Sequence, residues 1–348
     1  MNPVADIRAM WPRTGLVSHA SPVHRLERLE RWLGGGVEIY IKRDDLLRPF
    51  CGNKLRYIEY VLGAYRAGKH DCIVHCGEMT SNFLMQLAII GAQEGVPVHV
   101  LLRGDHPPVW QGNILLEDIF GACISYRGAE SKQSCSDIKR QYAQKLRSHG
   151  HDPFVIDYPL SNYIGILGNL GTYEELHIQI KKGDLPEIDH IVMCSAGNSY
   201  LGLRVASHLY GDMRRITAFP PIRFSDSGLG SVAADRRMFL LKKIREFADA
   251  TERELDIATV EFDEGFVGDG YGVPTSESIE AVRILASMEG VLLDPIYTGK
   301  AMAGLISYIR RGAVTPGTRI LFIHTGGWVN VFTFNNAFAE YKHSNPLN

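Results

Sequence analysis

The chain has 348 residues, of which 45% are hydrophobic and 22% charged, a composition typical of globular proteins and a length that predicts two domains. Its formal net charge of -2 gives no whole-chain attraction to nucleic acid or to an anionic membrane, so neither partner is expected. No apolar run reaches the ~18 residues of a transmembrane helix. The N-terminal residues 1–15 lack the basic start and apolar core of a secretory signal, which favours a cytoplasmic protein.

Possible metal ligands are few and poorly spaced. The six cysteines are spread along the chain, unlike the dense framework of a small secreted domain, and this favours reduced thiols. Cys72, His75 and Cys76 lie close together, but a structural zinc site needs four ligands, and no second pair follows at a suitable spacing. Asp44 and Asp45 directly follow two basic residues, so an ion-paired turn is the better interpretation. No metal site is predicted.

Short apolar runs alternate with longer helical patterns in chain order. Strands are expected at 37–42, 72–76, 97–102, 122–127, 154–159, 190–194, 216–220, 258–262 and 319–324. Helices are expected at 53–68, 80–95, 111–120, 133–148, 168–183, from about 200, at 231–248, at 276–288 and from about 299. This alternation predicts an α/β fold with parallel sheets covered by helices on both faces. Ligands of such sheets bind at the loops that follow the strands.

Two of these loops contain unusual chemistry. Lys54 stands at the mouth of a predicted helix, where the positive end of the helix dipole makes a cation unfavourable, so it is either solvated or an uncharged amine. The loop 195–199 (SAGNS) is small and polar and precedes a helix, so its backbone N–H groups are candidates for binding a phosphate. A tight turn with a capping serine is the plain alternative. The loop matches neither a Walker P-loop nor G-x-G-x-x-G, so a dinucleotide site is poorly supported.

Four further segments have small or hydroxyl-bearing residues near strand or helix ends. They are 77–82, with several helix-capping residues; the glycine-dense 265–275, with Tyr271; 292–305; and 325–328. Each is weak alone. Together with a phosphate-binding loop they predict one small anionic ligand with an aromatic side chain and several hydroxyls around it. A reactive lysine completes the set that pyridoxal phosphate needs.

Five sequence stretches carry a family resemblance. KRDDLLRPFCGNKLRYIEY, TSN, VGDGYGVPT, LLDPIYTGKAMAGL and FIHTGG resemble, in this order, the motifs of the D-cysteine desulfhydrase and 1-aminocyclopropane-1-carboxylate deaminase family. The resemblance extends over residues 15–335. It implies a fold-type II pyridoxal-phosphate enzyme, similar to the tryptophan synthase β subunit, with two open, twisted, mainly parallel sheets. It also implies a large cofactor-binding domain of residues 1–59 plus 166–348, an inserted small domain of residues 60–165, and a homodimer.

The same resemblance assigns roles to residues. It implies that Lys54 carries the cofactor as a Schiff base and later acts as a base. The catalytic residues that it implies are Lys54, Ser81, Tyr271 and Tyr297. The cofactor-binding residues are Lys54, Asn53, Asn82, Ala196, Gly197, Asn198, Ser199 and Thr298, with Thr298 facing the pyridine nitrogen. The residues expected to bind a small amino-acid substrate are Thr80, Ser81, Asn82 and Thr325.

Thr298 bears on the reaction. In the cyclopropane deaminase branch that the sequence resembles, a glutamate occupies this position. A carboxylate keeps the ring nitrogen protonated, whereas a threonine hydroxyl is far too weak a base to do so. The weaker electron sink suits loss of a good β leaving group and suits cyclopropane opening poorly. We therefore expect a lyase or deaminase that performs β-elimination to a keto acid and ammonia, as D-cysteine desulfhydrase does.

Several positions depart from the family pattern. Thr80 and Phe83 stand where the family has glutamine and histidine, and Asn198 replaces a glycine of the phosphate loop. The changes at Thr80 and Phe83, beside the expected carboxylate site, predict a substrate larger or less polar than D-cysteine, or a role in specialised biosynthesis. The alternatives are a β-replacement synthase, a 1-aminocyclopropane-1-carboxylate deaminase and a non-catalytic protein that binds pyridoxal phosphate. A nicotinamide oxidoreductase is favoured least.

Overall fold

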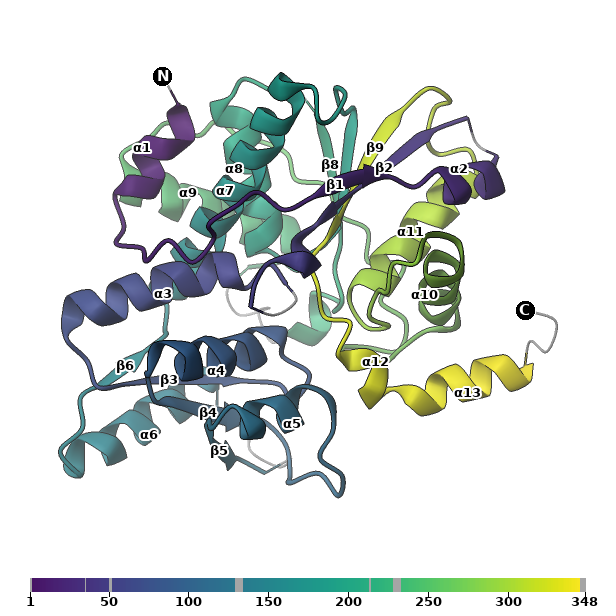
Figure 1. Ribbon diagram of the computed structural model, residues 1–348. Coiled ribbons are helices and arrows are strands. Elements are labelled where there is room, and N and C mark those ends of the chain that lie inside the picture. Colours follow the sequence, from purple (N-terminus) through teal and green to yellow (C-terminus); the bar gives the residue numbers. More distant parts are fainter. Residues whose placement is uncertain are drawn as a thin grey trace.

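The computed structural model describes residues 2–34, 36–49, 52–128, 134–212, 214–227 and 233–344, which form two open sheets (Figure 1). The larger sheet has the order β1 (Val23–Arg25), β2 (Glu38–Arg43), β9 (Arg319–His324), β7 (His190–Cys194), β8 (Arg215–Phe219), and only β1 is antiparallel to its neighbour. The smaller sheet is parallel throughout, in the order β5 (Cys123–Tyr126), β4 (Val98–Leu102), β3 (Cys72–Gly77), β6 (Pro153–Val155).

Helices cover both faces of the larger sheet. On one face lie α1 (Pro3–Ala9), α7 (Leu160–Lys182), α8 (Asn198–Leu209) and α9 (Arg236–Thr251), and on the other lie α2 (Glu27–Leu33), α10 (Ser276–Glu289) and α11 (Thr298–Arg310) (Figure 1). Strand β7 shows why: Ile191 and Met193 pack in the first cluster, whereas Val192 and Cys194 pack in the second. Successive side chains of a strand point to opposite faces, so a strand covered on both sides reads as a continuous apolar run.

The smaller sheet is also covered on two sides. Helices α3 (Leu55–Gly68), α4 (Asn82–Glu94) and α5 (Gly112–Ile119) pack on one side, and α6 (Cys135–Ser148) packs on the other, against Val74 and Cys76 of β3. Short helices α12 (Asn330–Thr333) and α13 (Asn335–Ser344) end the described chain, and 3-10 turns lie at Asp44–Leu46 and Ser225–Ser227. In the described part of the chain, no helix is long and apolar enough to cross a membrane.

The predicted strands at 190–194 and 319–324 are confirmed to the residue. The strand expected at 258–262 is wrong, because only Phe262 forms a bridge, to Ala218, before the chain turns away. The strand expected at 154–159 is also wrong in extent. It ends at Val155, since the carbonyl oxygen of Asp157 already accepts a hydrogen bond (2.9 Å) from the amide of Ser161 in the first turn of α7.

Helix α7 begins eight residues earlier than the expected 168–183. Its glycines allow neighbouring chain segments to approach closely. A Cβ atom added at Gly168 would lie 2.7 Å from the carbonyl oxygen of Arg56, and one added at Gly165 would lie 2.6 Å from the Cβ of Asn198. The helices α1 and α2 and the strand β1 near the N-terminus were not predicted.

Candidate active site

A cavity of about 590 Å³ opens at the carboxyl ends of strands from both sheets. Its walls come from the segments after β3, β7, β8 and β9 and from the start of α3. The predicted residues that line it are Asn53, Lys54, Ser81, Asn82, Ala196, Gly197, Asn198, Ser199, Tyr271, Tyr297 and Thr325. Two other predicted residues, Thr80 and Thr298, do not line the cavity.

Lys54 is the last residue before α3, so its amine lies near the N-terminus of that helix. Its Nζ atom is 4.6 Å from the centre of the Tyr57 ring, and both residues line the cavity. The preceding Asn53 donates its backbone N–H to the carbonyl oxygen of Thr325 at 3.0 Å. At Gly52 an added Cβ would lie 2.6 Å from Gln86 and 2.9 Å from the Thr325 carbonyl, so this approach requires glycine. The segment before Lys54 is thereby tied to the segment after β9.

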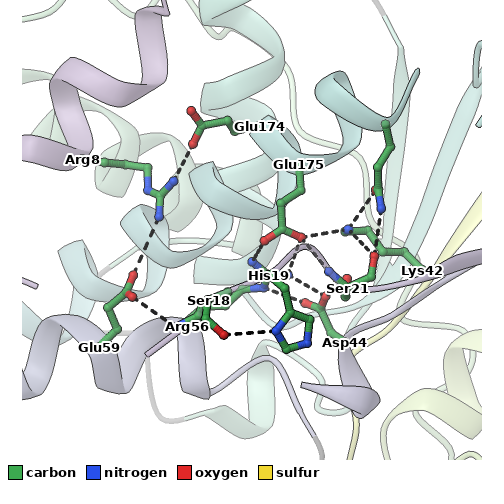
Figure 2. Close-up of polar contacts among 12 residues, drawn as sticks. Arg8, Ser18, His19, Ser21, Lys42, Asp44, Arg56, Glu59, Glu174 and Glu175 are labelled. Atoms are coloured by element: carbon green, nitrogen blue, oxygen red, sulfur yellow. Dashed lines mark hydrogen bonds and ion pairs between the residues drawn. The ribbon is translucent and has the colours of Figure 1, made fainter. Parts of the chain in front are cut away.

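A buried ion-pair network holds α3 two residues beyond Lys54 (Figure 2). The Arg56 guanidinium lies 2.8 Å from the Asp44 carboxylate and 2.6 Å from the Glu175 carboxylate. Lys42 also reaches Glu175, at 2.9 Å. Asp45 pairs with the basic residue before the turn, and in the described residues no group of three acidic, histidine or cysteine side chains is placed to hold a metal. The two aspartates therefore form ion pairs within the fold.

One end of the cavity is built to receive an anion. The Ser195 hydroxyl accepts hydrogen bonds from the N–H groups of Gly197 (3.1 Å) and Tyr200 (3.2 Å) and so shapes the turn into α8. The N–H groups of Asn198 and Ser199 are the first two of that helix, where the helix itself supplies no carbonyl partner. The dipole of α8 adds partial positive charge at the same place. This arrangement suits a phosphate group.

Lys243 adds a full charge to this end, and the sequence did not reveal it. Its Nζ donates a 2.8 Å hydrogen bond to the side-chain oxygen of Asn198, whose amide nitrogen donates to the Ser161 carbonyl at 3.1 Å. Burial lowers the pKa of Lys243 to about 8, so the amine is still largely protonated at neutral pH. In the sequence, Lys243 lies in a polar stretch of a predicted helix, where a lysine is normally exposed to solvent. The one sign in the sequence was Asn198, the hydrogen-bond partner of Lys243, which replaces a glycine of the family's phosphate loop.

Ser81 and Asn82 occupy the opposite wall. The Ser81 hydroxyl caps α4 by accepting the amide of Leu84 at 3.4 Å. The side-chain oxygen of Asn82 accepts two hydrogen bonds, from the amides of Asn113 (3.0 Å) and Asn330 (3.2 Å). Its own amide nitrogen remains available as a donor. The sequence had not indicated the two supporting asparagines, because they lie 31 and 248 residues away in the chain.

Two tyrosines form a hydrogen-bonded pair over the cavity. The hydroxyl groups of Tyr271 and Tyr297 contact each other, and that of Tyr297 also donates to the Thr80 carbonyl at 3.3 Å. Burial raises the pKa of both phenols, so they stay protonated at neutral pH. Lys300 holds the loop that carries Tyr271 by donating to the carbonyls of Val267 (2.6 Å) and Gly270 (3.1 Å).

Thr298 lies fully buried at the start of α11. Its hydroxyl donates a 2.6 Å hydrogen bond to the Asp294 carboxylate, which also accepts the backbone amides of Tyr297 (2.7 Å) and Thr298 (2.8 Å). Asp294 therefore orients Tyr297. Burial raises the pKa of Asp294 to about 6. The predicted contact of Thr298 with a ring nitrogen stays a prediction.

Comparison with known proteins identifies the family. The family model described as "Pyridoxal-phosphate dependent enzyme" matches residues 17–326. The chain belongs to this family. It is 31% identical over 340 residues to a D-cysteine desulfhydrase of Serratia proteamaculans, covering 94% of this chain and 97% of the relative. It is 30% identical over 343 residues to a 1-aminocyclopropane-1-carboxylate deaminase of Burkholderia multivorans, covering 95% and 98%.

Solved structures agree with this assignment. The crystal structure of an ACC deaminase homologue matches with a TM-score of 0.85 and 27% identity over 98% of this chain and 99% of that one. A threonine deaminase from Solanum lycopersicum shares the fold, with a TM-score of 0.64 at 16% identity over 99% of this chain and 93% of that one. The predicted fold-type II architecture is confirmed, and the cofactor of this pyridoxal-phosphate dependent enzyme is pyridoxal 5'-phosphate.

The residues of the cavity fit this cofactor. One volume of about 590 Å³, within the usual range for small-ligand sites, contains a lysine amine and a helix N-terminus with unpartnered N–H groups. The Asn82 amide, which retains its donor capacity, lines the same cavity from the opposite wall. An amine for a Schiff base, an anion-binding loop and polar groups between them are what pyridoxal phosphate requires.

Proposed function

We propose that this protein is a lyase that removes a β leaving group and ammonia from a small amino acid to release a keto acid, as the name of the D-cysteine desulfhydrase relative indicates. The observation that carries the proposal is the position of the Lys54 amine in one cavity with the protonated Tyr271–Tyr297 pair. β-Elimination requires a base that removes the proton from the α carbon and an acid that protonates the group leaving the β carbon, and the cavity contains both.

Lys54 would hold the cofactor and, once released by the incoming amino acid, take the α proton. When bound, pyridoxal phosphate supplies an electron sink for the charge left at that carbon. The N–H groups of Asn198 and Ser199 would bind the phosphate, with Lys243 as an additional cation. Asn53 and Asn82 would contact the ring substituents. These residues all line the cavity, which supports the roles proposed for them.

The substrate carboxylate would bind at Ser81 and at the N-terminus of α4, whose dipole favours an anion. Thr325, which follows β9 and lines the same cavity, would also bind this carboxylate. The two tyrosines would supply the proton to the leaving group, because burial keeps their hydroxyls protonated. Asp294 and Lys300 act as positioning residues, since each holds the backbone that presents a tyrosine.

The shape of the substrate side supports a less polar substrate than D-cysteine. Phe83 lines the cavity, with its ring centre 5.0 Å from that of His75 and 6.5 Å from that of Tyr57. Burial lowers the pKa of His75 to about 3, so this wall has no positive charge from the imidazole. The Thr80 carbonyl accepts a hydrogen bond from the Tyr297 hydroxyl at 3.3 Å, and the Thr80 side chain also interacts with both tyrosine hydroxyls.

Ring-opening deamination is the second candidate, favoured by the relative named 1-aminocyclopropane-1-carboxylate deaminase. We rank it lower because Thr298 stands where that branch has a glutamate. Among the described residues that line the cavity, Glu78 is the sole carboxylate, and it pairs with Arg103 at 3.1 Å. β-Replacement, in which a second nucleophile captures the substrate after the leaving group departs, uses the same residues.

The experiment is a substrate panel with the holoenzyme. Visible absorption is recorded, and keto acid is assayed, with D-cysteine, L-cysteine, both β-chloroalanine enantiomers and 1-aminocyclopropane-1-carboxylate. We expect keto acid from β-substituted amino acids and little from the cyclopropane. Faster turnover of the cyclopropane would refute the assignment, and a spectral change without keto acid would favour replacement. Lys54→Ala is expected to abolish the visible band, with Lys69→Ala as the control outside the cavity.

Three further expectations belong to this proposal. The large domain would comprise residues 1–59 plus 166–348 and the small domain residues 60–165, in line with the four strands of the smaller sheet lying between Cys72 and Val155. The protein would be a homodimer in the cytoplasm. Light scattering during gel filtration tests the dimer, and a monomeric mass at micromolar concentration would refute it.

A further inference from the structure

We propose that Cys76 and Cys135 are a redox-active dithiol, a site at which a reversible disulfide forms beside the substrate-binding loop. The two Sγ atoms are 3.1 Å apart, although the residues are 59 positions apart in the chain. Cys76 lies near the end of β3, and Cys135 is the first residue of α6, which packs on that strand. A disulfide needs a sulfur–sulfur distance of about 2.05 Å, so a movement of about 1 Å suffices.

The two cysteines have different environments. Cys76 is buried, whereas Cys135 is partly exposed at a helix N-terminus. The hydrogen bond from the Cys76 thiol, with the nearby charges of Arg103 and Lys139, lowers the pKa of Cys135 to about 7, while burial and Glu78 act in the opposite direction. The pKa of Cys76 is raised by the same contact and by burial. Cys135 is therefore the attacking thiolate, and Cys76 is the thiol that resolves.

The oxidant is a hydroperoxide such as hydrogen peroxide. The Cys135 thiolate attacks one peroxide oxygen, the O–O bond breaks, and the departing hydroxide takes a proton to become water. Cys76 then loses its proton and attacks the Cys135 sulfur. The S–O bond breaks, and the second hydroxide leaves as water with that proton. Two thiols and one peroxide give one disulfide and two waters, and two electrons pass from sulfur to oxygen. An added dithiol reverses the change by exchange.

The dithiol is connected to the active site through Arg103. This guanidinium pairs with Glu78 at 3.1 Å, and Glu78 lines the cavity. The backbone amide of Arg103 donates to the Gly77 carbonyl at 3.0 Å, directly after Cys76. Oxidation removes the thiolate that attracts Arg103 and ties the end of β3 to α6. Because Ser81 follows four residues after Gly77, the amino-acid side of the cavity changes, and the phosphate side does not.

The test uses the holoenzyme and hydrogen peroxide near equimolar amounts. We expect the thiol titre of the denatured protein to fall by two, the mass to fall by about 2 Da, and one peptide pair to link Cys76 with Cys135. Dithiothreitol should restore both thiols. Cys123→Ser, which removes an exposed cysteine, should behave like the wild type, and Cys135→Ser should form no such link. In Cys76→Ser, dimedone should label Cys135.

Three results would overturn the proposal. They are peroxide consumption at Cys123 as fast as at Cys135, sulfinic acid at Cys135 without a crosslink, and a disulfide between other cysteines. These measurements need no substrate, so their outcome does not depend on the proposed function. Only the following kinetic measurement rests on the proposed function. With thiol-free β-chloro-D-alanine as substrate, oxidation should raise KM severalfold and leave the visible cofactor band unchanged. An unchanged KM would refute the link to the substrate loop.

Discussion

Replacing Arg56 by Met tests whether the buried network in Figure 2 holds the helix that presents Lys54. Methionine retains most of the apolar side chain but leaves the carboxylates of Asp44 and Glu175 without their main partner. Burial alone would raise the pKa of Glu175, but the charges of Arg56 and Lys42 outweigh it and lower the pKa to about 2. Relative to an ordinary glutamate, this shift corresponds to about 3 kcal/mol of stability.

Breaking a buried pair by removing one partner costs about 3–5 kcal/mol, so we expect the free energy of unfolding to fall by about 3 kcal/mol at pH 7. The sign of the pH dependence follows from the lowered pKa of Glu175. The ion pair contributes fully above the ordinary glutamate pKa of about 4.5, and its contribution is lost as the pH falls toward the folded-state value of about 2. The difference between wild type and variant should therefore be largest near neutrality and narrow in acid.

Urea unfolding followed by tryptophan fluorescence and circular dichroism, at several pH values from 7 down to about 2.5, measures this difference. The control is Arg31→Met, which breaks the exposed pair with Glu27 and should cost less than about 0.5 kcal/mol. A loss below about 1 kcal/mol for Arg56→Met, or one independent of pH, would refute the reasoning. The network would then contribute little to the stability of the region around Lys54.

The remaining predictions concern the cavity. Tyr297→Phe should lower keto-acid release by about 10²-fold and leave the visible cofactor band unchanged; a rate within twofold of wild type would exclude Tyr297 as the proton donor. Lys243→Met should weaken binding of pyridoxal phosphate about tenfold, measured by fluorescence quenching, and leave the affinity for pyridoxal, which has no phosphate, unchanged. The control Lys242→Met, at the exposed neighbouring lysine, should change neither affinity. Thr298→Glu should raise ammonia release from 1-aminocyclopropane-1-carboxylate, and no gain there would contradict the role given to this position.

Local patterns were sufficient to predict the architecture. Strands β7 and β9 are continuous apolar runs because both faces are covered, and their bounds could be read directly. Lys54 and Ser81 could be located because each lies at the start of a predicted helix that follows a predicted strand. The predicted start of α7 was wrong by eight residues. Glycines have low helix propensity, and those of α7 are explained by neighbours that approach closely, Asn198 at Gly165 and Arg56 at Gly168.

The sequence by itself determined the fold class, the family and most of the residues that line the cavity, because these depend on local periodicity and on motifs within short segments. Only the tertiary structure showed that Lys243 faces the anion-binding loop, that Asn113 and Asn330 orient Asn82, and that Cys76 lies against Cys135. These contacts join residues far apart in the chain. Their geometry is set by helix packing against the sheets, which no local pattern encodes.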